Sequence, residues 1–237
     1  MERMTGGPLL LAADVSPLAD AALYAAAWGL VSARRREKAQ RFRFEKDRRL
    51  SLGAELLLRC ALREAGLATE TESIRTDDNG KPFFMDGRCS FSLSHSGSWA
   101  LCAVAGFELG CDMEELRPVD LKLARRFCPQ ECADILAQPS EAERQLLFYR
   151  YWTLKESYMK ATGLGLALPP DGFCIRLGQR ITVSRAGVEQ PYRFREFSEI
   201  PGCCCAVCGA GECGGAVLRT VDLAELLHGA GGPCGKA

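Results

Sequence analysis

The amino-acid sequence predicts an α+β fold: a pseudo-two-fold pair of similar α+β halves, each a long helix packed on a small, mostly antiparallel sheet. The chain has 237 residues, 47% of them hydrophobic, so it can bury one large core or two fused small ones. Each half has one long helical pattern and several short apolar runs separated by turn residues. We expect the halves to span residues 1–108 and 109–227, followed by a loose glycine-rich tail over residues 228–237.

The first half begins with an apolar strand pattern over residues 9–15. Ser16-Pro17 then predicts the start of a helix that runs to about residue 28. A second, longer amphipathic pattern covers residues 50–65 and ends at Gly66, and Gly53 inside it indicates close packing against a neighbour. These features predict the helical layer of the first half.

A strongly basic stretch lies between those two helices. Ser32 is its predicted N-cap, and residues 34–49 contain nine Lys or Arg against three Asp or Glu. A charge run usually marks a solvated helix face, but it can also contact phosphate groups. The phosphate interpretation depends on the motifs that follow.

Turns and short strands complete the first half. Residues 78–82 form a turn signal, and residues 83–85 and 91–93 have strand character. The small-residue loop over residues 94–98 exposes backbone N–H groups and hydroxyls, to which His95 adds a donor, so an anion could bind there. A single histidine in a polar loop is more often structural, and this loop alone does not establish a site.

The second half is organised around one long helix. Ser140 with Glu143 forms a capping box, and Gly163 supplies a stop. Within this helix a large aromatic ring, a carboxylate and an ammonium recur every four residues, at Trp152, Glu156 and Lys160, and so lie on one face. Strand patterns follow at residues 173–177, 181–183, 192–194 and 203–207. A surface Glu-to-Lys pair beside a core Trp would explain the helix pattern equally well.

Two further carboxylates favour a functional interpretation. The strand-like run over residues 99–105 is followed by Asp112 and Glu114, which point to the same side of an extended chain, roughly 6 to 7 Å apart. Two like charges on one strand face need a counter-ion. Together with Glu156 they would suit a hard cation such as Mg²⁺, which also binds phosphate oxygens.

Composition excludes several classes of protein. Thirty basic and thirty acidic residues cancel, so no overall field favours nucleic acid or an anionic membrane. No apolar run reaches the ~20 residues that a membrane-spanning helix needs. Thirteen cysteines, an odd number without regular spacing, indicate a reducing cytoplasm. Cys205 and Cys208 form a C-x-x-C, but without a second ligand pair we expect buried thiols rather than a zinc site.

The motifs together resemble one known family. They are Gly110-x-Asp112-x-Glu114 and Trp152-x-x-Lys155-Glu156-Ser157-x-x-Lys160, with Gly80-Lys81-Pro82 and Phe91-Ser92-Leu93-Ser94-His95-Ser96 upstream. In this order they are similar to those of 4′-phosphopantetheinyl transferases of the larger, surfactin-synthetase-activating type. The resemblance covers nearly the whole chain and implies a single-chain pseudodimer. It also implies transfer of the phosphopantetheine arm of coenzyme A to a serine of an acyl or peptidyl carrier protein, with release of 3′,5′-ADP.

The resemblance also implies roles for individual residues. It makes Asp112, Glu114 and Glu156 the Mg²⁺ ligands and Lys160 the residue that holds the coenzyme A pyrophosphate, so that Glu156 and Lys160 are the expected catalytic residues. The positions that it places around coenzyme A are Arg35, Lys38, Arg49, Lys81, Pro82, Ser94 and His95, with Arg49 and His95 near the 3′-phosphate. Lys155 and Trp152 match motif positions that could be structural.

The expected chemistry is phosphoryl transfer. A serine hydroxyl attacks a pyrophosphate whose charge is neutralised by Mg²⁺ and Lys160, and Glu156, directly or through a metal-bound water, is the candidate base. The alternatives are a metal-dependent phosphohydrolase that uses the same carboxylates, or an inactive relative that binds coenzyme A or a carrier protein. We expect no nucleic-acid or membrane partner and take a monomer as the working expectation. The sequence does not distinguish among carriers of fatty acid, polyketide and nonribosomal peptide synthesis.

Overall fold

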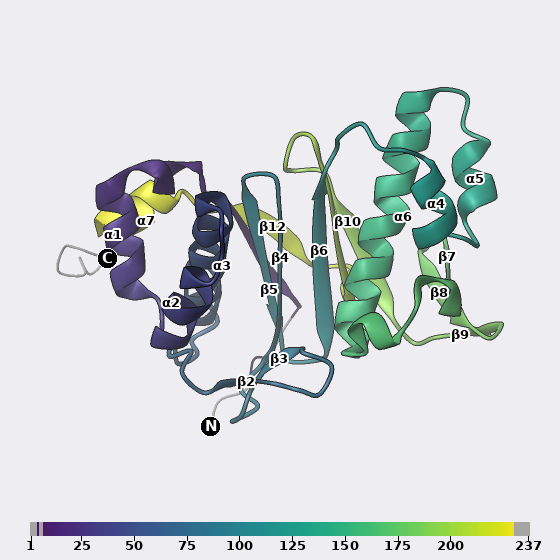
Figure 1. Ribbon diagram of the computed structural model, residues 1–237. Coiled ribbons are helices and arrows are strands. Elements are labelled where there is room, and N and C mark those ends of the chain that lie inside the picture. Colours follow the sequence, from purple (N-terminus) through teal and green to yellow (C-terminus); the bar gives the residue numbers. More distant parts are fainter. Residues whose placement is uncertain (1–3, 5–6, 230–237) are drawn as a thin grey trace.

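The computed structural model describes residue 4 and residues 7–229, which form four layers in the order helix, sheet, sheet, helix (Figure 1). The first helical layer is α3 (Glu45–Glu64), with α1 (Ala21–Leu30) and α2 (Ala33–Gln40) beside it. The last is α6 (Glu141–Thr162), with the short helices α4 (Lys122–Phe127) and α5 (Cys132–Leu136). The predicted α+β fold of two helix-on-sheet halves is confirmed.

The sheet of the first half has four strands in the order β12-β1-β5-β4. Its strands are β1 (Leu9–Asp14), β4 (Ser90–Ser96), β5 (Trp99–Ala105) and β12 (Val217–Thr220). The β1–β5 and β4–β5 pairs are antiparallel, whereas β12 lies parallel to β1. A separate hairpin, β2 (Ile74–Thr76) with β3 (Pro82–Phe84), extends below this sheet.

The sheet of the second half has three antiparallel strands in the order β10-β11-β6. They are β6 (Leu109–Glu115), β10 (Arg193–Phe197) and β11 (Cys203–Gly209). A smaller sheet of β7 (Cys174–Arg176), β8 (Thr182–Arg185) and β9 (Val188–Glu189) lies beyond α6. Short 3₁₀ turns cover Ser16–Ala19, Gly165–Ala167 and Pro170–Gly172.

The end of the described chain returns to the first half. Val217–Thr220 pairs with Leu9 to Ala12 of β1, and α7 (Leu223–Gly229) buries Leu223 and Leu227 in the core beneath α3. The sequence division placed residues 217–227 in the second half and residues 228–229 in a tail. The pairing corrects that placement, because strand character alone cannot show which sheet a strand joins. Residues 230–237 of the predicted tail lie outside the described residues.

Three hydrophobic clusters follow the layers. One lies between α3 and its sheet, one lies between the two sheets, and one lies between α6 and its sheet. Strands buried on both faces explain the continuous apolar runs in the sequence, because an alternating pattern would expose one face. Cys205 and Cys208 illustrate this: Cys205 is buried between the sheets, and Cys208 is buried beneath α6. They therefore face opposite sides of β11, and the zinc alternative fails.

Local signals define the helix ends. Ser140 and Glu143 form the predicted capping box, and Gly163 ends α6 with a φ of 70°. Ser32 caps α2 as predicted. The first helix differs from the prediction: it begins at Ala21, because the Asp20 side chain accepts hydrogen bonds from the N–H groups of Ala22 and Leu23. Within the described part of the chain, no helix has the length and apolar character needed to cross a membrane.

One glycine allows the close contact between α6 and β6. A Cβ atom on Gly110 would lie 2.2 Å from the carbonyl oxygen of Ser157 and 2.4 Å from the backbone nitrogen of Ala161. The backbones of strand and helix therefore touch at this position, which no other residue type allows without displacement. The contact places the acidic end of β6 against the face of α6 that carries Glu156 and Lys160.

Candidate active site

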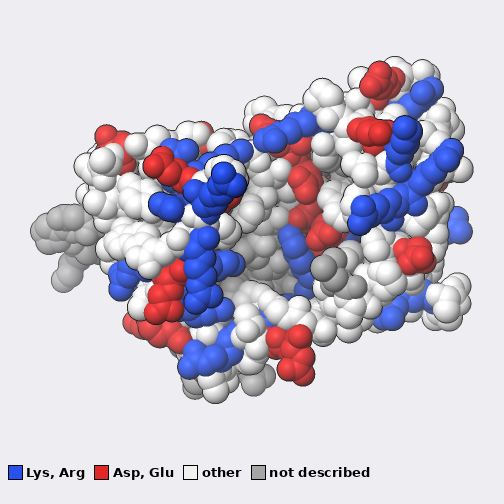
Figure 2. All heavy atoms as spheres, viewed as in Figure 1, with Lys and Arg blue, Asp and Glu red and all other residues white. Residues whose placement is uncertain are grey.

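A cleft of about 710 Å³ lies between the two halves. Its walls come from α2, the second and third turns of α3, the β2–β3 hairpin, β4 and the C-terminal end of α6. Figure 2 shows Lys and Arg gathered on the α2 and α3 side of the hollow, and a band of Asp and Glu on the opposite side. The hollow therefore has cations on one side and carboxylates on the other. Asp112, Glu114 and Glu156 are not among the residues that line the cleft, but Asp112 contacts one that does, Lys160.

The carboxylates beside the cleft are carried by β6. Asp112 and Glu114 both face β4, where Ser94 Oγ donates to Asp112 Oδ1 at 2.7 Å and Ser96 Oγ donates to Glu114 Oε2 at 2.9 Å. The two carboxylates thus lie on one strand face, as the spacing predicted. Residues two apart on β4 hold residues two apart on β6, so the polar pairing follows the strand period.

Asp112 forms an ion pair with Lys160, one of the residues that line the cleft. Lys160 Nζ lies 2.6 Å from Asp112 Oδ1 and also donates to Ser94 Oγ at 3.0 Å. The second carboxylate oxygen, Asp112 Oδ2, is buried and has no hydrogen-bond partner within the described residues. A buried carboxylate oxygen without a partner is costly, and it fits a site that completes its coordination with a cation.

Glu114 is held from both halves of the molecule. In addition to Ser96 on β4, the indole Nε1 of Trp152 on α6 donates to Glu114 Oε1 at 3.3 Å. The Trp152 ring packs against Phe127 of α4, with ring centroids 4.5 Å apart. Trp152 therefore orients a carboxylate as well as filling the core.

Burial and the charge of Asp112 raise the pKa values of Glu114 and Glu156. Burial is the largest cause for both Glu114 and Glu156, and the charge of Asp112 is the next, so both pKa values lie above their ordinary range. Burial is the largest cause acting on Lys160 and by itself would lower its pKa, but the charge of Asp112, its hydrogen bond and the other nearby acidic groups together outweigh burial, so the pKa lies above its ordinary value. One ammonium thus compensates three carboxylates, and the site has an excess of negative charge.

That excess suits a divalent cation, but the side chains do not form a complete ligand set as they stand. Across residue 4 and residues 7–229, no three His, Cys, Asp or Glu side chains converge closely enough to hold a metal ion. Of the two carboxylate oxygens of Asp112, Oδ1 is paired with Lys160, and Oδ2 is buried and has no hydrogen-bond partner among the described residues. The assignment of Asp112, Glu114 and Glu156 as ligands stays a prediction.

The basic wall carries several cations and one carboxylate, Glu37. Arg34, Lys38 and Arg41 line the cleft, and none of them forms an ion pair with any residue in the described ranges. Burial and, next, the charge of Arg35 lower the pKa of both Arg34 and Lys38. Crowded cations of this kind attract a polyanion, because a bound phosphate relieves their repulsion.

The structure brings together most of the predicted coenzyme-binding residues. Arg35, Lys38, Lys81, Pro82, His95 and Lys160 line the cleft. Ser94 is buried and contacts the cleft through Lys160. Arg49 is partly exposed on α3 but is not among the residues that line the cleft.

Lys81 and Lys155 have structural partners. Lys81 Nζ donates to the Glu108 carboxylate and, at 3.0 Å, to the carbonyl oxygen of Ala161, so it joins the hairpin to α6. Lys155 is fully buried and pairs with Glu131 at 3.0 Å. The carbonyl oxygens of Pro170 and Phe173 complete the environment of its ammonium. Lys155 therefore fixes α6 to neighbouring segments and does not face the cleft.

Sequence reasoning missed several cleft residues. They are Arg34, Arg41, Phe42, Thr76, Asn79, Ser92 and Met159. The charge run contained Arg34 and Arg41, and helical spacing from Lys38 could have selected them. Thr76 and Asn79 carry no such signal, because a short hairpin reaches the cleft only through tertiary packing.

Comparison with known proteins agrees with this geometry. Residues 108–208 match the model of the 4′-phosphopantetheinyl transferase superfamily, and residues 17–106 match that of the 4′-phosphopantetheinyl transferase N-terminal region. The transferase Sfp of Bacillus subtilis (strain 168) is 34% identical over 202 residues, covering 83% of this chain and 90% of the relative. The transferase psf-1 of Bacillus pumilus is 36% identical, covering 75% and 78%. The chain therefore belongs to the 4′-phosphopantetheinyl transferase family.

Proposed function

We propose that the chain transfers the 4′-phosphopantetheine arm of coenzyme A to a serine of an acyl or peptidyl carrier protein, with Mg²⁺, and releases 3′,5′-ADP. The observation that carries the proposal is the contact of Lys160 with Asp112 at 2.6 Å, because it joins the basic wall of the cleft to the carboxylates of β6. A pyrophosphate needs both: cations for its charge and carboxylates for the metal that neutralises it.

Coenzyme A carries negative charge at two places, its 3′-phosphate and its pyrophosphate. The crowded cations of α2 suit the nucleotide end, with Lys81 and His95 on the neighbouring elements. Lys160 reaches the inner end, where it would hold the pyrophosphate beside the carboxylates. The distribution of cations along the cleft supports this orientation of the coenzyme.

The carboxylates fit a magnesium ion. Asp112 contributes a buried oxygen that has no hydrogen-bond partner among the described residues. Burial and, next, the charge of Asp112 raise the pKa values of Glu114 and Glu156, and a bound cation would stabilise their ionised forms. When bound, Mg²⁺ would neutralise the pyrophosphate oxygens during the transfer. Ser94, Ser96 and Trp152 orient the carboxylates from behind.

The serine hydroxyl of the carrier must lose a proton as it attacks the phosphorus atom. Glu156 is the candidate base, because burial raises the pKa of its carboxyl toward the range in which a carboxylate accepts protons efficiently. The same group is a candidate metal ligand, so a metal-bound water is the second route for the proton. Lys160 would hold the leaving 3′,5′-ADP phosphate in place.

The proposal includes coenzyme A and a carrier protein as partners, no nucleic acid or membrane, a monomer, and a cytoplasmic location. Every cysteine within the described residues is a free thiol, which supports a reducing compartment. Six Lys and Arg side chains line one cleft, which supports a small anionic ligand over a nucleic-acid duplex.

An intact-mass assay tests the proposed function. An apo acyl or peptidyl carrier protein is mixed with the chain, coenzyme A and Mg²⁺, with an EDTA control. We expect a phosphopantetheine adduct that disappears in EDTA. Cleavage of coenzyme A without an adduct would favour the phosphohydrolase alternative. Binding of coenzyme A without cleavage or transfer across several carriers would favour the inactive relative.

A further inference from the structure

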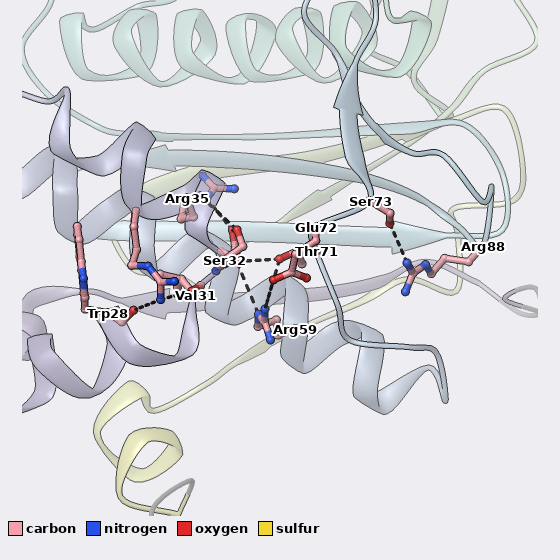
Figure 3. A network of polar contacts seen from close by, with 11 residues as sticks. Trp28, Val31, Ser32, Arg35, Arg59, Thr71, Glu72, Ser73 and Arg88 are labelled. Atoms are coloured by element: carbon pink, nitrogen blue, oxygen red, sulfur yellow. Dashed lines mark hydrogen bonds and ion pairs between the residues drawn. The ribbon is translucent and has the colours of Figure 1, made fainter.

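The buried carboxylate of Glu55 joins three segments of the first half. Glu55 lies on α3 with 2% of its surface exposed. Its Oε1 accepts from the backbone N–H of Ser32 at 2.6 Å and from Thr71 Oγ1 at 2.8 Å, and its Oε2 accepts from Ser32 Oγ and Arg35 Nε, both at 3.0 Å. Figure 3 shows Ser32, Arg35, Arg59 and Thr71 close together within one network of polar contacts.

The three segments are the ones that build the basic end of the cleft. Ser32 is the N-cap of α2, which carries the cleft residues Arg34, Lys38 and Arg41. Thr71 belongs to the segment that leads into β2, which contributes Ile74 and Thr76 to the facing wall. One carboxylate therefore fixes the spacing between the two sides of the cleft.

The sequence of α2 makes this anchor necessary. The helix has eight residues, has arginine at positions 34, 35 and 36, and has no acidic residue in its first turn. Short helices are marginal on their own, and cations at an N-terminus oppose the helix dipole. The Glu55 carboxylate supplies the missing negative charge at that end, and it occupies both the N–H and the hydroxyl of the cap residue.

The carboxylate remains ionised in the fold. Burial by itself raises the pKa of Glu55, but the backbone N–H of Ser32 and then the charge of Arg35 outweigh it, and the pKa lies below its ordinary value. Both oxygens are fully used by donors, so no proton is needed to satisfy them. The anchor is therefore charged at neutral pH.

We propose that Glu55 is a positioning residue for coenzyme binding, which holds the cations of α2 at the distance from β2 that the phosphate end of the ligand requires. This inference rests on the proposed function, since it takes coenzyme A as the ligand of the cleft. Glu55 itself does not line the cleft, so it acts through α2 and Thr71. No group that Glu55 contacts belongs to the carboxylate site on β6.

The test uses Glu55→Gln in the full chain, in the intact-mass assay at varied coenzyme A. An amide of the same shape cannot accept from all four donors, so α2 loosens. We expect the KM for coenzyme A to rise about 10-fold while kcat changes less than about 3-fold, because alignment at the basic end is lost and the carboxylate site is untouched. Hydrogen exchange should accelerate at residues 33–40 more than in the rest of the first half.

Glu131→Gln is the matched control. Glu131 is equally buried and paired, with Lys155, but it lies in the second half, away from the basic wall. It should destabilise the fold without raising the KM for coenzyme A. Ser32→Ala removes only the cap hydroxyl and should give a smaller rise in KM, about 3-fold, if Glu55→Gln fails to fold.

If the wild type is active and both Glu55→Gln and Ser32→Ala have its KM for coenzyme A, the inference is overturned and the proposed function stays intact. An equal rise in KM in Glu131→Gln would also overturn it, since lost stability would then explain the effect. A wild-type chain that neither binds coenzyme A nor transfers its arm would overturn the proposed function and this inference together.

Discussion

The two halves share a helix-on-sheet plan but use it differently. In the first half the long helix itself carries the close-contact glycine: a Cβ on Gly53 of α3 would lie 2.5 Å from Val15 Cγ1. In the second half the strand carries it, at Gly110 of β6, where the contact is with helix backbone. A Cβ atom on Gly53 would meet a side chain, which can shift. A Cβ atom on Gly110 would meet helix backbone, which cannot shift without moving the helix.

This difference matches what each half presents to the cleft. The first half uses a buried carboxylate, Glu55, to hold a crowded row of cations on α2. The second half brings strand carboxylates against the ammonium of Lys160 through direct backbone contact. The two halves thus have the same architecture but different roles. The first half supplies the basic wall with the cations of α2, called here the binding wall, and the second half supplies the carboxylates with Lys160, called here the reactive wall. Substitutions can therefore affect one wall without the other.

The largest effect should come from the reactive wall. Glu156→Gln removes a carboxylate that Asp112 and Glu114 already repel, so the fold should remain intact. We expect transfer with Mg²⁺ to fall at least ~100-fold, since a metal ligand or base is lost. Intact-mass kinetics with circular dichroism as a folding control measure this, and near-normal turnover would remove Glu156 from the site.

Gly110→Ala should push β6 away from α6. The added Cβ meets the Ser157 carbonyl and the Ala161 nitrogen, so β6 must move away from α6. We expect a loss of about 3 kcal/mol in the free energy of unfolding, together with loss of transfer. Gly29→Ala on α1, where the Cβ has open space, is the control and should not destabilise. Equal stability of the two variants would refute the close contact.

A smaller effect is expected on the binding wall. Lys38→Ala or Lys81→Ala should raise the KM for coenzyme A about 10-fold with little change in kcat, because each removes uniform binding. Lys46, exposed on α3 and outside the residues that line the cleft, provides a matched control in the same basic stretch. An unchanged KM in both cleft variants would place the nucleotide elsewhere.

The smallest effect concerns pH. Burial and, next, the charge of Lys160 lower the pKa of His95, so the imidazole is neutral at pH 7. A bound phosphate favours the imidazolium, so the KM for coenzyme A should fall a few-fold more in the wild type than in His95→Asn as the pH drops from 7.5 to about 6. If the KM for coenzyme A depends on pH in the same way in both proteins, His95 does not contact the coenzyme.

Local chemistry made much of this structure predictable. The capping box at Ser140, the stop at Gly163 and the strand spacing of Asp112 and Glu114 depend on nearest neighbours, and all appear as expected. The parallel pairing of β12 with β1 depends on contacts between residues more than 200 positions apart, for which the sequence holds no local signal. The same holds for Thr76 and Asn79 in the cleft.

Glu55 illustrates a second limit. In the sequence it is one acidic residue within an amphipathic helix. Its burial depends on contacts with Ser32 and Thr71, which are distant from it in the sequence. Buried charges are rare, and they are recognised by their partners rather than by their position in a pattern.

The division of labour between the two walls can be tested most directly by calorimetric titration of coenzyme A into Glu156→Gln and wild type in EDTA. Without metal, Glu156 places a negative charge beside the pyrophosphate, so its removal should leave the Kd unchanged or lower it. A Kd more than about 10-fold higher in the variant would contradict the account, because Glu156 would then belong to the wall that binds the coenzyme.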